Sequence, residues 1–240
     1  MWEDILQRHE RIALQFSGGK DSMACLFLLR PWLDRITVYW LNAGDPIPET
    51  VEVINACREF IPHFVEVRSD VKRWRELHGD PSDVVPTSAS PLGRMLGFGT
   101  IPISDRFSCC QQNIMYPMYR RMKEDGITCV IRGQKLCDMP TVPLKSGDSL
   151  DGFEFCYPIE NWSHDDVLNY LQEIGAPLHP CYAHGVTGVD CLHCTAWWNE
   201  SHLPFIKERY PSVYLVVREK IKHIQQVVTE HMAHLQSVGD

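Results

Sequence analysis

The sequence predicts an α/β protein with a doubly wound, mainly parallel five-stranded sheet, flanking helices and a helical C-terminal tail. Three observations carry this prediction. Short apolar and β-branched runs alternate with runs of helical spacing through the first half of the chain. A glycine-rich loop joins the first apolar run to the helix that follows it. Residues 203–234 have the pattern of one long, mostly helical segment.

The expected elements follow one another in a regular order. Residues 11–16 are an apolar run of strand length, and Val51, Ile54 and Cys57 share one face of a helix. Ser163 precedes acidic residues at a helix start, and Gly175 ends that helix. The expected strands are residues 11–16, 36–41, 64–67, 127–132 and 153–159, and the expected helices are residues 23–29, 49–60, 114–122, 163–174 and 203–234. Residues 79–107 are rich in Pro, Gly and Ser, and we expect a long loop that covers a site.

Composition restricts the class of protein. The 240 residues carry a net charge of −8, which disfavours tight, non-specific binding of nucleic acid. The basic clusters at 68–75 and 120–123 leave a nucleic-acid substrate as an alternative, although we interpret both clusters as solvated helix faces. No apolar run reaches membrane-spanning length, and the acidic start at residues 1–4 lacks the features of a signal peptide. We therefore expect a cytoplasmic protein with no membrane association, either monomeric or a homo-oligomer.

The loop Ser17-Gly18-Gly19-Lys20-Asp21-Ser22 has the composition of a phosphate site. Glycines let backbone N–H groups approach an anion, and the helix start adds partial positive charge. Ser17 and Ser22 can donate to phosphate oxygens, and Lys20 supplies a full charge. The spacing is neither that of a Walker loop nor that of G-x-G-x-x-G. Asp21 either holds Mg²⁺ or caps the helix.

Ten cysteines are many for a reducing compartment, and four of them form two close pairs, Cys109-Cys110 and Cys191-x-x-Cys194. Four thiolates can hold a [4Fe-4S] cluster or zinc, and free thiols remain a further interpretation. Adjacent cysteines suit a zinc knuckle poorly, because neighbouring side chains diverge. His193 and His184 are alternative ligands. We expect Cys25, Cys57, Cys129 and Cys156 to be buried as small hydrophobic residues.

Ser-Gly-Gly-x-Asp-Ser after a first strand resembles the pyrophosphate loop of the ATP pyrophosphatases, or adenine nucleotide α-hydrolases. Residues 42–50, Asn-Ala-Gly-Asp-Pro-Ile-Pro-Glu-Thr, resemble the "TGxxFPET" segment of the phosphoadenosine phosphosulfate (PAPS) reductase branch, and residues 158–167 resemble its "P…W…DV" segment. The resemblance spans roughly residues 11–198 and implies an adenine-nucleotide ligand, ATP with Mg²⁺ or the sulfonucleotides APS and PAPS. It also implies nucleotide contacts from Asn42 and Gly44.

The four paired cysteines resemble the [4Fe-4S] signature of adenylyl-sulfate (APS) reductases, including "CxxCT" at Cys191 to Thr195. That resemblance implies that Cys109, Cys110, Cys191 and Cys194 are the metal ligands. The chain departs from the family elsewhere. Sulfonucleotide reductases attack with a cysteine in a C-terminal "ECGxH" segment, whereas residues 195–240 contain no cysteine. Cys137 and Cys181 are the alternative thiols. Lys135 stands where the family often has arginine, so it keeps the charge without the bidentate fork.

These features predict a PAPS reductase-family enzyme with residues 1–200 as nucleotide-binding domain and 201–240 as a helical extension. The complete loop favours ATP-dependent adenylylation with pyrophosphate release, coupled to sulfur transfer, as in DNA phosphorothioation and some tRNA thiolation systems. The expected catalytic residues are Lys20, Asp21 and Lys135. Two alternatives stay open: an APS or PAPS reductase that releases sulfite with a thioredoxin-like partner, and a non-catalytic nucleotide-binding subunit. The adenylylating enzyme would need a sulfur donor.

Overall fold

The computed structural model describes residues 2–98, 103–139, 141, 143–186, 188, 191–198 and 202–239. Two compact units make up the chain, and each is assembled from several segments. Unit 1 comprises Met1–Asn42, Pro48–Arg68 and Pro117–Tyr182, and unit 2 comprises Ala43–Ile47, Ser69–Tyr116 and Ala183–Asp240. The expected glycine loop belongs to unit 1, whereas all four paired cysteines belong to unit 2.

Unit 1 contains a six-stranded sheet in the order β3-β2-β1-β6-β8-β7. Its strands are β1 (Ile12–Gln15), β2 (Ile36–Asn42), β3 (Phe64–Arg68), β6 (Cys129–Ile131), β7 (Ser149–Leu150) and β8 (Phe153–Cys156). The five expected strands are present and pair in parallel. The sixth, β7, is antiparallel to β8 and was not expected. Two exposed residues carry no period-2 pattern, and only the positive φ of Asp151 and Gly152 marks the hairpin turn.

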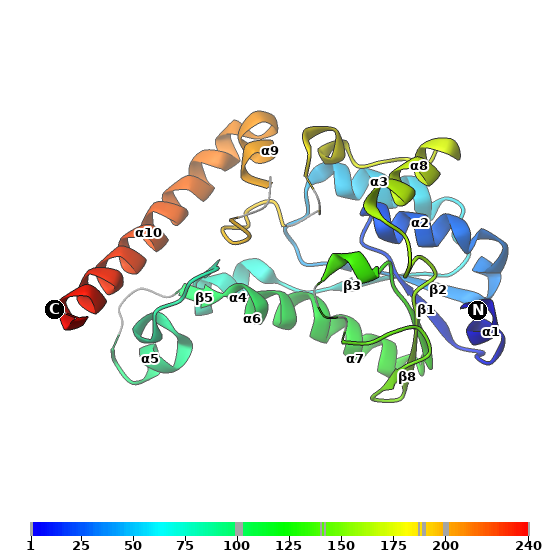
Figure 1. Ribbon diagram of the computed structural model, residues 1–240, viewed down its shortest axis with the longest axis horizontal. Coiled ribbons are helices and arrows are strands. Elements are labelled where there is room, and N and C mark those ends of the chain that lie inside the picture. Colours follow the sequence, from blue (N-terminus) through cyan, green and yellow to red (C-terminus); the bar gives the residue numbers. More distant parts are fainter. Residues whose placement is uncertain are drawn as a thin grey trace. The chain divides into compact units, whose positions relative to one another are not determined.

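Helices cover both faces of this sheet, as the continuous apolar strands require. One face packs against α2 (Lys20–Leu28), α3 (Pro48–Arg58) and α8 (His164–Glu173), and Figure 1 shows these helices grouped together. The short helix α1 (Trp2–Gln7) adds Ile5 and Leu6 to the same core. The other face packs against α7 (Tyr116–Glu124) through Met118 and Met122. The doubly wound architecture is therefore confirmed, and so is the burial of the four single cysteines expected in the core.

Unit 2 is built from short elements and two longer helices. It holds α4 (Val71–His78), β4 (Asp80–Ser82), α5 (Pro91–Met95), β5 (Ile103–Asp105), α6 (Arg106–Cys110), α9 (His202–Arg209) and α10 (Pro211–Gly239). The expectation of one long loop over 79–107 was wrong, because β4 and β5 form a parallel pair and Thr87–Ala89 is a 3₁₀ turn. The two strands read Asp-Pro-Ser and Ile-Ser-Asp, so no apolar run marked them in the sequence. Residues 99–102 of that segment lie outside the described residues.

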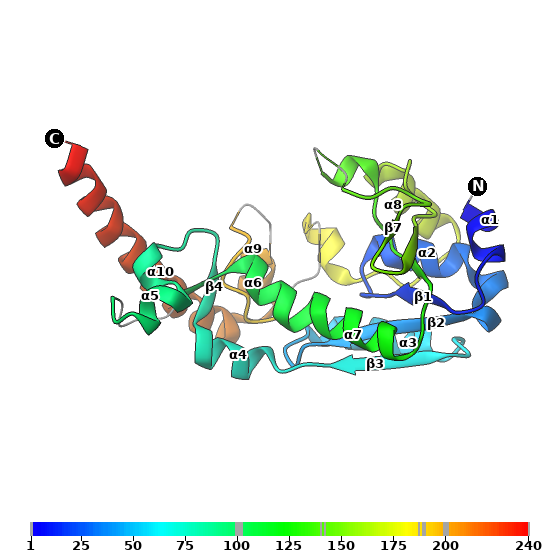
Figure 2. The same cartoon turned by 90° about the horizontal axis from the view of Figure 1, so that it is seen from below.

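The expected helical tail is present as two helices. A proline at position 211 opens α10, which then runs without interruption for 29 residues (Figure 2). Further short helical turns lie at Arg30–Arg35, Leu136–Asp138 and Pro180–His184. In the described part of the chain, no helix combines the length and apolar character needed to cross a membrane.

Candidate nucleotide site and cysteine site

The glycine loop lies at the edge of the sheet where a doubly wound fold places its ligands. All strands except β7 run in parallel, so their carboxyl ends share one edge. The chain leaves β1 toward β2 and β3 on one side and later adds β6 and β8 on the other. Strand order therefore reverses between β1 and β6, and ligands of open α/β sheets bind outside such a switch point. Residues 17–22 follow β1 and residues 133–138 follow β6 at this point.

Within the loop, hydrogen bonds fix a tight turn into α2. Gly18 has a φ of +79°, a conformation that side chains rarely adopt, and Gly19 is the N-cap of α2 with no side-chain cap. The Ser17 and Ser22 hydroxyls lie 3.1 Å apart, and Ser22 Oγ donates to the Gly19 carbonyl at 3.0 Å. The backbone N–H of Lys20 donates to the Tyr182 hydroxyl at 2.8 Å. A helix start without a side-chain cap suits an anion.

Two buried lysines converge on Asp21. Lys20 Nζ donates to both carboxylate oxygens at 2.8 Å, and Lys135 Nζ donates to Oδ1 at 2.6 Å. The Lys135 side chain is fully buried, and that of Lys20 is only 4% exposed. Lys135 also pairs with Asp138 Oδ1 at 2.8 Å, and Lys20 Nζ lies 3.2 Å from His164 Nδ1. Both ammonium groups are therefore held in place by carboxylates rather than by solvent.

The charge of Lys135 survives its burial. Desolvation alone lowers the pKa of a buried ammonium, but the hydrogen bonds to Asp138 and Asp21 outweigh it and leave the pKa of Lys135 raised. Lys135 therefore lies beside the loop as a permanent cation. The helix-cap interpretation of Asp21 was wrong, because Gly19 occupies the N-cap and Asp21 lies inside the first turn.

Gly133 explains how Lys135 reaches the loop. A Cβ built on Gly133 would lie 2.6 Å from the backbone carbon of Asp21 and 2.8 Å from the nitrogen of Ser22. The chain after β6 therefore runs directly against the start of α2, and only glycine allows this approach. Asn42 ends β2 and donates to Glu66 at 3.0 Å, whereas Gly44 belongs to unit 2.

Cys137, Asp138 and His164 form a second group in unit 1. Their ligand atoms lie within 4.8 Å of one another, and all three residues are exposed. The Cys137 thiol donates to the carbonyl of Trp162 at 3.4 Å. Of the two alternative thiols, Cys137 is accessible, whereas Cys181 is buried.

The paired cysteines of unit 2 come from two separated segments. Cys109 and Cys110 end α6, which continues as a π turn over Gln111–Met115. Such turns are rare and occur frequently at functional sites. Cys191 pairs with Pro46 in an isolated bridge, and the N–H of Cys194 donates to the Cys191 carbonyl at 3.1 Å. No group of three cysteines among the described residues has its sulfur atoms within 4.8 Å of one another.

A buried arginine lies among these thiols. Arg75 Nη1 donates to Asp45 Oδ2 at 2.8 Å and to the His193 carbonyl at 3.3 Å. Both side chains of the Arg75–Asp45 pair are less than a tenth exposed. Arg75 Nε has no hydrogen-bond partner among the described residues. The interpretation of residues 68–75 as a solvated face was therefore wrong for Arg75, the one basic residue of that cluster that points inward.

The pKa of Arg75 reflects electrostatic interactions with three thiols as well as with Asp45. Burial works against the charge of Arg75, but its pKa is raised by Cys191, Asp45, Cys109 and Cys194 in that order. Burial raises the pKa of Cys109, and Arg75 opposes that shift. The alternative histidine ligands have other partners: His193 Nδ1 lies 2.7 Å from Asp45 Oδ1, and His184 pairs with Glu208 at 3.3 Å. Cys109, Cys191 and Cys194 thus each interact electrostatically with the buried Arg75.

Comparison with known proteins identifies the family of this chain. A model described as the phosphoadenosine phosphosulfate reductase domain matches residues 11–197. The chain belongs to this family. It is 21% identical over 192 residues to the adenosine 5′-phosphosulfate reductase of Allochromatium vinosum, covering 80% of this chain and 70% of the relative. It is 26% identical over 196 residues to a phosphoadenosine 5′-phosphosulfate reductase of Xanthomonas campestris, covering 79% and 73%.

Among solved structures, the fold is similar to that of a phosphoadenylyl-sulfate reductase from Candida auris, with a TM-score of 0.57 at 14% identity. The match covers 80% of this chain and 88% of that one. The sequence pattern marked the loop, Lys135 and the paired cysteines as candidate site residues, and their roles stay predictions. It missed Tyr182, Asp45 and Arg75 as contributors. Asp45 lies in the segment that resembles "TGxxFPET", which was the available signal, whereas nothing in the sequence marked Tyr182.

Proposed function

We propose that this member of the PAPS reductase family is an enzyme that binds ATP with Mg²⁺ at residues 17–22. It adenylylates an acceptor with release of pyrophosphate, and this step is coupled to sulfur transfer in the cytoplasm. The observation that carries the proposal is the ion network in which Lys20 and Lys135, both buried, share Asp21. Two fixed cations beside a helix start without a side-chain cap favour a polyphosphate, because transition-state charge on a leaving phosphate needs donors already in place.

Each residue of the loop then has a role. Gly18 and Gly19 bring backbone amides to the pyrophosphate, and Ser17 and Ser22 donate from their hydroxyls. Lys20 and Lys135 neutralise phosphate charge after exchanging Asp21 for phosphate oxygens. Asp21, freed in this way, is the carboxylate that would hold Mg²⁺, an ion that prefers oxygen ligands. An acceptor oxygen attacks the α-phosphorus, the bond to the bridging oxygen breaks, and pyrophosphate leaves. Asn42, of the same unit, is a proposed nucleotide contact.

The donor set of unit 2 fits an iron–sulfur cluster. Zinc–sulfur bonds of about 2.3 Å would hold four sulfurs roughly 3.8 Å apart, closer than any three of these cysteine sulfurs lie among the described residues. A [4Fe-4S] cluster spreads its ligands over four irons and so favours wider spacing. Arg75, with an unpaired Nε, is a counter-charge for the thiolates. Cys109, Cys110, Cys191 and Cys194 would hold the cluster, which supplies electron-transfer or sulfur-handling chemistry when bound.

A second candidate is an APS or PAPS reductase that releases sulfite. The relatives favour it, because the chain is 21% and 26% identical to proteins with those names. The reaction requires a thiolate, and Cys137, exposed and within 4.8 Å of His164, is the accessible one outside the paired cysteines. A thioredoxin-like protein would then restore the thiol.

One set of assays separates the candidates. Protein purified anaerobically is incubated with ATP and Mg²⁺, and separately with APS or PAPS plus thioredoxin. Pyrophosphate release supports adenylylation, and sulfite release supports the reductase. Nucleotide binding without turnover, tested across candidate acceptors, indicates a binding subunit. Absence of affinity for all three nucleotides contradicts the proposal. Iron analysis should find about four iron and four sulfide per chain, and a colourless, zinc-loaded sample contradicts the cluster.

A further inference from the structure

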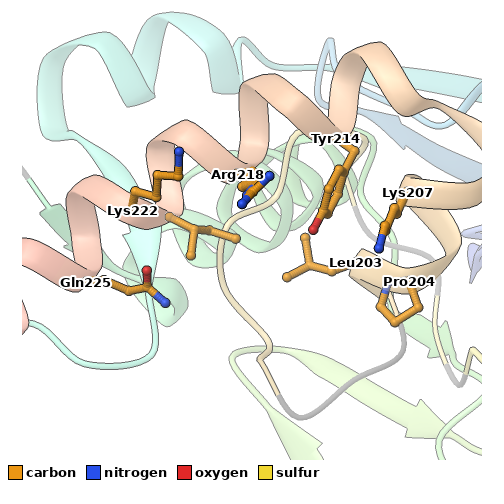
Figure 3. Close-up of a pocket in the computed structure, with 8 residues that line it drawn as sticks. Leu203, Pro204, Lys207, Tyr214, Arg218, Lys222 and Gln225 are labelled. Atoms are coloured by element: carbon orange, nitrogen blue, oxygen red, sulfur yellow. The ribbon is translucent and has the colours of Figure 1, made fainter.

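A groove of about 610 Å³ lies along α9 and α10 in unit 2 (Figure 3). Its lining residues are Leu203, Pro204, Lys207, Tyr214, Arg218, Ile221, Lys222 and Gln225. Three of these are cations and none is acidic, although the whole chain has 31 acidic residues against 23 basic ones. The groove therefore reverses the sign of the protein's net charge locally, and this arrangement attracts an anion.

The cations of the groove are available to a ligand. Lys207, Arg218 and Lys222 are exposed. Among the described residues, neither Lys207 nor Arg218 forms an ion pair with a carboxylate. Lys222 pairs with Glu219 at 2.6 Å, but both side chains are more than half exposed. Such a surface pair contributes little, so Lys222 can exchange it for another anion.

The lining residues alternate charge with apolar and aromatic surface. Tyr214, Arg218 and Lys222 follow one another at four-residue spacing on α10, about 5.4 Å per turn, and Figure 3 shows them along one side of the groove. Lys207 comes from α9, and its Nζ lies 5.8 Å from the centroid of the Tyr214 ring. Leu203 and Ile221, both half-buried, add apolar surface. Cations beside an aromatic face hold single-stranded nucleic acid, because phosphates bind the cations and bases stack on the ring.

We propose that the α9–α10 groove binds a segment of single-stranded nucleic acid. Three phosphate contacts on a protein of net charge −8 give modest, salt-sensitive affinity. The logarithm of the binding constant should fall against the logarithm of salt concentration with a slope of about −2.

The test measures binding of fluorescein-labelled oligothymidylate and oligouridylate, about ten nucleotides long, by fluorescence anisotropy at low salt. Lys207→Gln and Arg218→Gln should each weaken binding and together reduce the salt slope by about 1.4. Tyr214→Ala should weaken binding roughly five- to hundredfold through lost stacking. Arg73→Gln is the matched control, because Arg73 is an exposed cation of the same unit that lies outside the groove. It should leave binding unchanged.

ATP affinity of the same variants separates this inference from the proposed function. Lys207 and Arg218 are exposed, so their variants should fold, and Tyr214→Ala is interpreted only with an unchanged circular dichroism spectrum. Binding of either oligonucleotide that is lost in the groove variants supports the proposal. Equal oligonucleotide binding by the wild type and the double variant overturns the proposal. It is also overturned if the wild-type protein binds ATP but neither oligonucleotide. If the wild-type protein binds an oligonucleotide but has no affinity for ATP, the result contradicts the proposed nucleotide site and leaves the groove proposal standing.

Discussion

The nucleotide loop of unit 1 and the cysteine site of unit 2 both bury a cation, but they neutralise it differently. Lys135 is matched by two carboxylates, those of Asp21 and Asp138. Arg75 has one carboxylate partner, Asp45, and keeps Nε unpaired beside three thiols. The loop is thus organised by the protein's own ion pairs. At the cysteine site, in contrast, thiols contribute to the electrostatic interaction with the buried cation.

The largest expected effect comes from removing the Arg75 side chain. Arg75→Ala leaves Asp45 buried without its cation, and breaking a buried pair costs about 3–5 kcal/mol. Arg73→Ala removes an arginine from the same helix whose side chain is 64% exposed, and it should cost less than about 0.5 kcal/mol. Urea unfolding of both variants measures the difference, and the iron content of Arg75→Ala should fall as well. Similar unfolding midpoints for the two variants would show that Arg75 is not part of a buried charge site.

Acid should destabilise unit 2 through His202. Its side chain is 1% exposed, and neither ring nitrogen has a hydrogen-bond partner among the described residues. Burial lowers the pKa of His202 from 6.5 to about 4, and Asp45 opposes this only in part. Between about pH 4 and pH 6.5, the unfolded chain therefore binds a proton at His202 that the folded chain does not bind. The contribution of His202 to stability should be constant well above pH 6.5 and should fall by about 3 kcal/mol as the pH drops toward 4.

Denaturant unfolding at several pH values checks this dependence, with His202→Leu as comparison. In His202→Leu, most of the loss of stability at acid pH should disappear. A smaller part should remain, because burial also lowers the pKa of His179 in unit 1. An unchanged pH profile in His202→Leu would contradict the assignment.

The sequence predicted the two regions unequally. Unit 1 could be predicted because its central strands lie in buried apolar runs, and because Gly18 and Gly19 mark a turn with a physical requirement. Ser163 was correctly placed as a helix cap, since it accepts from the N–H of Asp166. The edge strand β7 escaped because it spans two exposed residues.

Unit 2 resisted prediction because its contacts join distant segments. Arg75 and Asp45 are 30 residues apart, and the Arg75 contact to His193 spans 118. In the sequence alone, Arg75 is one of several arginines on a polar helix. Only the folded chain shows that it points inward. The cysteine spacing predicted a shared site, but not the cation among the thiols.

Replacing Lys135 tests whether the loop is organised for phosphate. Lys135→Ala removes one charged hydrogen-bond donor, worth about 1.5–3 kcal/mol, so ATP affinity should fall roughly ten- to hundredfold. Asp21 still accepts hydrogen bonds from Lys20 in this variant, which limits the structural damage. Isothermal titration measures the affinity, and Lys123→Ala, on an exposed stretch of α7, serves as control. Lys135→Arg should recover part of the binding, because it restores the charge. Unchanged ATP affinity in Lys135→Ala would remove Lys135 from the nucleotide site.

The smallest effect tests the close approach that brings Lys135 to the loop. Gly133→Ala places a Cβ 2.6 Å from the backbone of Asp21, and backbone cannot swing aside as a flexible side chain does. Overpacking of this kind costs about 1–3 kcal/mol. Gly188→Ala meets no described atom within 4 Å and should change stability by less than about 0.5 kcal/mol. Because the clash displaces the start of α2, Gly133→Ala should also weaken ATP binding, whereas Gly188→Ala should not. A tolerated alanine at 133, with stability and ATP affinity intact, would mean that β6 and the loop are less tightly joined than their backbones indicate.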